Sequence, residues 1–184
     1  MKAVVQDRYG EADVLRLDDV DVPAPGPGEV LVKVAAAGVD RGVWHLMAGR
    51  PYLVRTVTGL RTPRTRVRGR EVAGTVEATG PDVTGLRPGD EVYGIAEGTF
   101  AEYAVGKAAK LAPRPAGLTP EQAAAMPISG ASALQAVRDA GGVAAGQKVL
   151  VIGRPGASAR SPCRSRRRTA PRSPACAGRR RPTS

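Results

Sequence analysis

The sequence predicts a mainly β fold, in which a small barrel-like β domain over residues 1–118 precedes the first elements of an α/β domain over residues 119–153. Two observations carry this prediction. Many short apolar runs separated by Gly- and Pro-rich turns fill the first range, as in small β-barrels. Two helical patterns followed by a continuously apolar run fill the second, as at the start of a parallel sheet.

The β domain begins with two short apolar runs, "KAVVQD" and "LRLDDVDVP", and a stronger strand, "GEVLVKVAAAGV", which follows the turn "PAPGPG". A long irregular section over residues 40–71 comes next. "EVAGTVEATG" and "DEVYGI" are then two strands joined by the turn "LRPGD", and "TFAEYAVG" and "AKLAPRP" are two more. Strands this short and this closely spaced favour a barrel-like domain.

The α/β segment begins with a helix start signal. Thr119 is a typical N-cap, Pro120 suits the first helical position, and Glu121 follows it. "SGASALQAVRDAGGV" is predicted to be a second helix that ends at glycines, and "QKVLVIG" a buried strand of a parallel sheet.

The positive charge of the chain is concentrated at one end. The net charge is +11, but residues 154–184 hold ten arginines with no lysine and no acid, which leaves +1 for residues 1–153. Both cysteines, Cys163 and Cys176, also lie in this tail, which is expected to be disordered because it has no large apolar side chain. The sequence shows no signal peptide and no membrane-spanning run, so we expect a cytoplasmic protein with no membrane partner.

The order of these elements resembles the medium-chain dehydrogenase/reductase superfamily, in particular its zinc-free quinone oxidoreductase-like, alcohol dehydrogenase-like branch. The resemblance rests on "PGPGEVLVKVAAAGVD", "GREVAGTVEATGPDVTGLRPGDEVYG", "GTFAEYAV", "LTPEQAAAMPISGASALQAV" and "GQKVLVIG". It implies a GroES-like, partly open β-barrel with short helices, which carries much of the substrate cleft. A Rossmann domain that binds NADPH should follow, and full-length relatives are often homodimers.

The residues at the zinc positions favour the zinc-free branch. Where zinc-dependent relatives have a Cys and a His, this sequence has Asp40 and Arg70, and the part before residue 154 contains no cysteine. Catalytic zinc needs three protein ligands, and His45 is the only histidine. We therefore expect no metal.

The resemblance implies hydride transfer from NADPH to a quinone, enone or carbonyl substrate, with little acid–base help from the protein. Asp40 stands where quinone reductases usually have an Asn that faces the nicotinamide, and His45 and Tyr52 have the spacing of residues that line the cleft. Ser132 matches a Thr or Ser that hydrogen-bonds the cofactor, and Gly153 begins the glycine turn.

Structural alternatives stay open for these residues. Asp40 can simply cap the segment after the strand, His45 can pack against Trp44, and Ser132 can be a small residue at a helix start. Nearby, "RPYLVRTVTGLRTPRTRVRGR" holds seven arginines. It can form an anion site for a 2′-phosphate or an anionic substrate, but a solvated loop is the favoured interpretation, because no aromatic interleaving or glycine nest accompanies it.

The sequence departs from the family after Gly153. There "RPGASA" replaces the glycine-rich turn that lets backbone N–H groups contact a pyrophosphate. A diverged turn is one explanation, and a change of reading frame is the favoured one. If one nucleotide is missing, serine and cysteine codons place T in the middle of the original codons, which encodes apolar residues. The recovered peptide is "ASGGVGAFAVQIAKAYGAEVTGV", so the chain is predicted to be truncated and inactive.

Two functions of other classes remain as alternatives. The arginine-rich tail would bind nucleic acid non-specifically through phosphates, but it has no aromatic residue for base stacking, so no specific nucleic-acid partner is expected. A free-standing GroES-like interaction module is the other. An open frame that continues a Rossmann domain in the DNA would favour the oxidoreductase.

Overall fold

The computed structural model describes residues 1–144 and 146–149, and the chain divides into two compact units, Met1–Pro127 and the residues from Ile128 onward. The expected disordered tail and Gly153 lie outside the described residues, as does most of the expected strand "QKVLVIG". The domain boundary expected at residue 118 stays a prediction.

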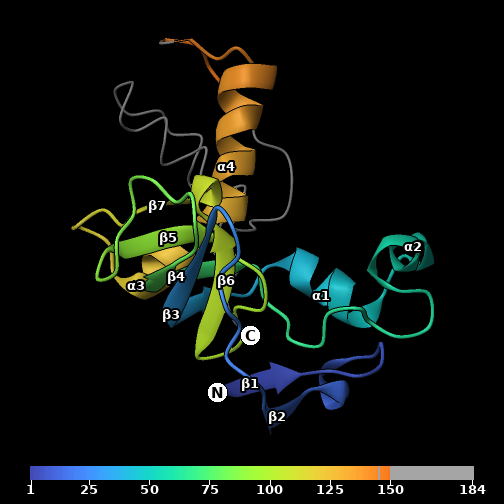
Figure 1. The fold of residues 1–184 in the computed structure, drawn as a ribbon. Helices are drawn as coiled ribbons and strands as arrows, with labels where there is room; N and C mark the ends of the chain where they lie inside the picture. Colours follow the sequence, from blue (N-terminus) through green and yellow to red (C-terminus); the bar gives the residue numbers. More distant parts are fainter. Residues whose placement is uncertain (145, 150–184) are drawn as a thin grey trace, which may run out of the picture. The chain divides into compact units, whose positions relative to one another are not determined.

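The first unit is built on a five-stranded antiparallel sheet with the order β6-β3-β4-β5-β7 (Figure 1). A separate two-stranded sheet pairs β1 with β2, and isolated bridges join Ala3 to Ala101 and Val5 to Val67. The strands are β1 (Lys2–Val5), β2 (Arg16–Asp19), β3 (Glu29–Gly38), β4 (Glu71–Thr79), β5 (Glu91–Ile95), β6 (Tyr103–Lys107) and β7 (Leu111–Pro113).

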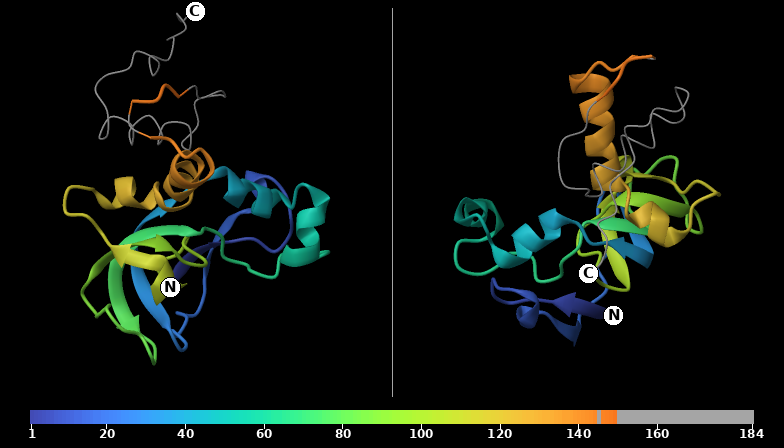
Figure 2. Two further views of the ribbon diagram at one scale, coloured as in Figure 1. Left: turned by 90° about the horizontal axis from the view of Figure 1, so that it is seen from above. Right: turned by 180° about the vertical axis from the view of Figure 1, so that it is seen from behind.

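The mainly β, partly open barrel expected from the sequence is therefore confirmed. The strands of the larger sheet curve around the core without closing on themselves (Figure 2). Alternate side chains point inward, as the period of a strand requires. The core residues, all nearly inaccessible to water, are Val30, Val32, Val72, Val76, Leu86, Val92, Ala96 and Ala104. Burial of each valine contributes about 1.5–3 kcal/mol.

The short helices expected in the β domain lie in residues 40–71, the section whose sequence pattern is irregular. They are α1 (Arg41–Ala48), a 3-10 turn (Tyr52–Val54) and α2 (Arg55–Thr58). The α1 helix ends at Gly49, which adopts the left-handed conformation at φ +60°. These helices are too short for a clear periodic pattern, so the sequence did not locate them.

The helix start expected at Thr119 is confirmed. Thr119 and Gln122 form a capping box at the start of α3 (Pro120–Ala124), with Pro120 in the first turn. Ala123 and Ala124 are buried against Ala73 of β4, so α3 covers part of the sheet. The second expected helix is α4 (Pro127–Gln135), which continues as a π-helical turn over Ala136–Ala140. Among the described residues, no helix has the length and apolarity needed to cross a membrane.

Candidate active site

A cleft of about 360 Å³ in the first unit is a candidate binding site. It lies among α1, the end of α2, the segment before β4 and the turn after β5. We call it the Arg68 cleft. Its lining residues are Val43, Leu46, Val57, Thr58, Arg64, Thr65, Val67, Arg68, Gly69, Arg70, Glu97 and Gly98. A volume of this size suits a small organic molecule.

The lining has two chemical characters. Four aliphatic side chains, those of Val43, Leu46, Val57 and Val67, form its apolar part. Three arginines and one carboxylate form its charged part, so positive charge prevails in the lining. The exposed charged residues are Arg64, Arg70 and Glu97.

Arg68 differs from the other arginines of the cleft because it is buried. Its residue is only 6% exposed, and its Nε donates to Oε1 of Gln6 at 2.9 Å. Its Nη2 is buried with no hydrogen-bond partner. In the described part of the chain, no carboxylate lies within ion-pairing distance of it. Burial lowers the pKa of Arg68, an effect that the nearby Tyr9 opposes, but an arginine keeps its proton in proteins.

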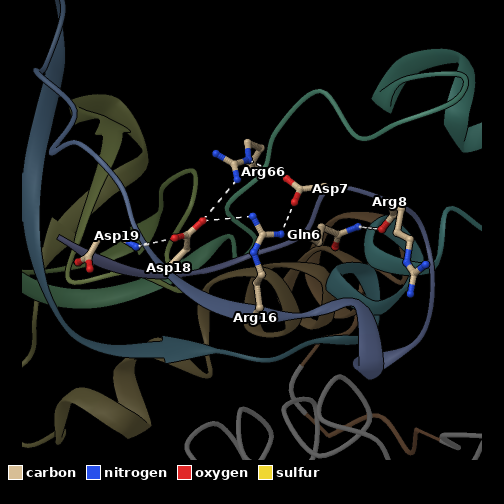
Figure 3. Close-up of polar contacts among 7 residues, drawn as sticks. All are labelled: Gln6, Asp7, Arg8, Arg16, Asp18, Asp19 and Arg66. Atoms are coloured by element: carbon tan, nitrogen blue, oxygen red, sulfur yellow. Dashed lines mark hydrogen bonds and ion pairs between the residues drawn. The ribbon is translucent and has the colours of Figure 1, made fainter.

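Gln6 holds the guanidinium of Arg68 in place. The Gln6 side chain is fully buried, and its Nε2 donates to the backbone oxygen of Arg8 at 3.0 Å (Figure 3). The same Nε2 donates to the backbone oxygen of Met47 at 3.2 Å. With both donations made, Oε1 is directed to Arg68. The position of the charge is therefore set by the backbone before any ligand binds.

The backbone after Arg68 is tightly packed. Gly69 has φ +98°, and a Cβ atom there would lie 2.2 Å from Oγ1 of Thr99 and 2.7 Å from the Phe100 ring. Thr99 is itself buried, and its Oγ1 has no hydrogen-bond partner. Only glycine fits this position, which fixes the path of the chain between Arg68 and Arg70.

Asp40 and His45 lie on α1, outside the lining of the Arg68 cleft. Asp40 is the N-cap of α1, and its Oδ1 accepts from the backbone N–H of Val43 at 2.8 Å. His45 is half-buried, its Nδ1 lies 2.9 Å from the backbone oxygen of Arg50, and its ring meets that of Trp44 edge to face at 5.0 Å. Both residues thus have the structural roles that the sequence left open, and their catalytic roles stay predictions.

Tyr52, Ser132 and Gly153 are not brought together by the described structure. Tyr52 is 68% exposed at the start of the 3-10 turn, and the guanidinium of Arg55 lies 4.9 Å from its ring centroid. Ser132 is exposed on α4, and Gly153 lies outside the described residues. The structure does not assign a role to any of the three.

Sequence reasoning did not single out Arg68. The solvated-loop interpretation fits the neighbouring Arg61, Arg64, Arg66 and Arg70, which are exposed, but it is wrong for Arg68. Nothing local in the sequence separates Arg68 from these residues, because its burial depends on contact with Gln6, 62 positions away.

The described residues also contain no group of three His, Cys, Asp or Glu side chains that could hold a metal ion. Arg70, at the position of a zinc-ligating histidine in zinc-dependent relatives, has a cationic side chain that cannot ligate a metal.

Comparison with known proteins agrees with this fold. Residues 26–116 match the family described as the alcohol dehydrogenase GroES-like domain. The chain is 34% identical over 175 residues to the human mitochondrial NAD(P)H oxidoreductase RTN4IP1, covering 85% of this chain and 44% of that protein. It is 35% identical over 144 residues to the chloroplastic quinone-oxidoreductase QR1 of Triphysaria versicolor, covering 74% of this chain and 42% of that protein.

Solved structures give the same result. An NAD-dependent alcohol dehydrogenase superposes with a TM-score of 0.80 at 33% identity, over 92% of this chain and 56% of the other. The quinone oxidoreductase of Coxiella burnetii does so with a TM-score of 0.69 at 28% identity, over 77% of this chain and 45% of the other. The chain spans less than half the length of the curated oxidoreductases that it matches. The chain therefore belongs to the medium-chain dehydrogenase/reductase superfamily, and its first unit contains the alcohol dehydrogenase GroES-like domain of that family.

Proposed function

We propose that this chain is the amino-terminal part of an NADPH-dependent oxidoreductase, which transfers a hydride to a quinone, enone or carbonyl substrate without zinc. The observation that carries the proposal is the Arg68 cleft, an apolar and cationic cleft in a GroES-like domain. A relative of known structure, a mycobacterial protein complexed with NADPH, is 33% identical with a TM-score of 0.69, over 82% of this chain and 43% of that chain. The substrate would be a small molecule, and we place the enzyme in the cytoplasm.

The zinc-free part of the proposal rests on the donor set. Zinc as a Lewis acid needs three protein ligands, and the described residues around Asp40 and His45 provide no such group. Elemental analysis of the purified protein is expected to find no stoichiometric zinc. One zinc per chain that is lost on changing Asp40 or His45 would contradict the proposal.

The described residues do not complete a site for NADPH. Of the two residues expected to contact the cofactor, Ser132 offers one exposed hydroxyl on α4, and Gly153 lies outside the described residues. A single hydroxyl cannot hold a dinucleotide, whose pyrophosphate needs a glycine turn at a helix N-terminus. We therefore propose that the chain binds NADPH weakly or not at all, and that it is an inactive fragment.

Restoring the reading frame tests this proposal. One nucleotide inserted after the Gly153 codon should yield a longer protein that oxidises NADPH in the presence of a quinone or enone, because the glycine turn is regained. The matched control is the 184-residue chain, shown intact by mass spectrometry. The idea of an inactive fragment is wrong if this control binds NADPH at micromolar concentration and reduces a quinone. An insertion that meets immediate stop codons would contradict the frame change.

A further inference from the structure

We propose that the Arg68 cleft binds the oxyanion group of a small amphipathic molecule, a carboxylate or phosphate attached to an apolar body. The inference of a binding site stands on the cleft alone, whereas the statement that this molecule is the substrate rests on the proposed function. Positive charge in the cleft would then select anionic substrates among quinones, enones and carbonyl compounds.

The first argument is the uncompensated charge of Arg68. A buried ionised group is strongly disfavoured unless it is paired. Arg68 is 6% exposed, and the one hydrogen-bonding partner of its guanidinium in the described structure is the neutral amide of Gln6. A guanidinium carries five donors in a planar fork that matches an oxyanion, and here Nη2 has no acceptor. An anionic ligand would supply both the missing acceptor and the missing charge.

The second argument is the position of this charge in the wall of a cleft. Arg64 and Arg70 line the same cleft and are exposed, so they add positive charge at its surface. Glu97 is the one carboxylate of the lining, and it opposes them. The three arginines still leave the cleft cationic, which attracts an anion from solution.

The third argument concerns the body of the ligand. Val43, Leu46, Val57 and Val67 line the same cleft as the arginines. A hydrated inorganic anion would gain nothing from these side chains, whereas an apolar body would be buried against them. The combination therefore favours an organic anion over a free ion.

The site is pre-organised at one end and adaptable at the other. Gln6 and the tightly packed Gly69 fix the backbone and the guanidinium. Since Nη2 is closed off from water, direct contact with a ligand oxygen requires a small movement of the wall. The residues that we expect to move are Val57, which is 74% exposed, and Arg64, which is also exposed.

The test compares two ligands of the same shape and different charge, benzoate and benzamide. Binding to the 184-residue chain is measured by NMR titration or thermal shift, without NADPH. We expect benzoate to bind at least about tenfold more tightly than benzamide, because a hydrogen bond between two charged groups is stronger than one to a neutral amide. Inorganic phosphate is the free-anion arm, and it should bind more weakly than benzoate because it lacks an apolar body.

Variants assign the effect to the cleft. Arg68→Met should abolish the preference for benzoate, and Arg64→Met should reduce it. Arg61→Met is the matched control, because Arg61 is exposed and does not line the cleft. Arg64 is exposed, so its variant stays informative if Arg68→Met does not fold.

Each remaining outcome has one meaning. Equal binding of benzoate and benzamide, or a preference that both Arg68→Met and Arg64→Met leave unchanged, overturns the proposal. If phosphate binds as tightly as benzoate, the inference that the ligand has an apolar body is wrong. If the frame-restored protein is an active reductase but shows no preference for anionic ligands, the anion site is wrong and the proposed function stands. Anion binding without reductase activity in that protein refutes the proposed function alone.

Discussion

Arg66 and Arg68 are two residues apart in the chain, but their surroundings are opposite. Arg66 is half exposed, and its Nε donates to Oδ1 of Asp7 at 2.8 Å, while its Nη2 lies 3.6 Å from Asp18 (Figure 3). Arg16 contacts the same two carboxylates, so two cations and two anions form one surface network. Arg68 is buried, and the one described partner of its guanidinium is the neutral amide of Gln6.

This difference shows that the number of arginines in the loop says little about binding. The charges of the surface network are compensated by each other and screened by salt, and exposed pairs of this kind contribute little to stability. The charge of Arg68 has no acidic partner among the described residues, and the residue is only 6% exposed. The stability of this buried charge therefore depends on its hydrogen bond with Gln6 and on any anion that enters the cleft. The variants below are arranged by the size of the effect expected on the unfolding free energy.

Gly69→Ala is expected to have the largest effect, because it disturbs the backbone next to the buried Arg68. The new Cβ would lie 2.2 Å from Oγ1 of Thr99 in a residue with φ +98°. Backbone strain and overpacking together should lower the free energy of unfolding by roughly 2–5 kcal/mol, measured by urea denaturation.

Gly85→Ala is the matched control, because Gly85 has φ +83° but no atom within 4 Å of a built Cβ. Its free energy of unfolding should fall by about 1–2 kcal/mol, the effect of backbone strain without overpacking. Equal losses in the two variants would contradict the close packing around Gly69.

Gln6→Ala is expected to have the next largest effect, because it removes the one described partner of the Arg68 guanidinium and two donors to backbone oxygens. Loss of a hydrogen bond to a buried charge should lower the free energy of unfolding by roughly 2–3 kcal/mol. Chemical denaturation at low and high salt measures it, and salt should change the loss little because the pair is buried.

Gln135→Ala, at the exposed end of α4, is the control and should be nearly neutral. In the Arg68→Met background, Gln6→Ala should lower the free energy of unfolding by less than it does in the wild type. An equal loss in both backgrounds would show that Gln6 does not act through Arg68.

Asp7→Asn is expected to have the smallest effect, because it acts on the exposed network. Hydrogen bonds from Arg16, and then from Arg66, hold the pKa of Asp7 below its usual value of 3.8. Because the folded-state pKa is the lower one, the stabilisation is complete above the unfolded pKa and is lost as pH falls through the folded pKa. Asp7→Asn should therefore lower the free energy of unfolding slightly at neutral pH. The variant should also lose less stability than the wild type as the pH falls into the acid range.

Urea denaturation across this pH range, at low and high salt, measures the contribution of Asp7. High salt should remove most of the difference from wild type, since the network is exposed. Asp21→Asn is the control, because Asp21 is exposed outside the network. If the loss of unfolding free energy in Asp7→Asn does not depend on salt, the network behaves as a buried interaction, which contradicts this prediction.

Much of the fold followed from local patterns. The apolar runs of β3 and β4, the turns between strands and the cap at Thr119 are short-range signals, and the structure confirms the elements that they predict. The α1 helix was not located, although two roles were open for its N-cap Asp40, one that faces the nicotinamide and one that caps the segment after the strand. A capping aspartate and a cleft aspartate cannot be told apart in the sequence, because the residue type does not show which backbone groups the carboxylate contacts in the folded chain.

The sequence by itself determined the mainly β architecture and the abrupt change of composition after Gly153, because these depend on residue order and periodicity alone. The family followed from the resemblance of its motifs to those of known members. Only the tertiary structure decided which of seven similar arginines is buried. Arg68 is distinguished by contacts with Gln6 and with the backbone near Phe100, and both lie more than 30 positions away. Burial is a property of residues that meet in space, so no local pattern of charge could have predicted it.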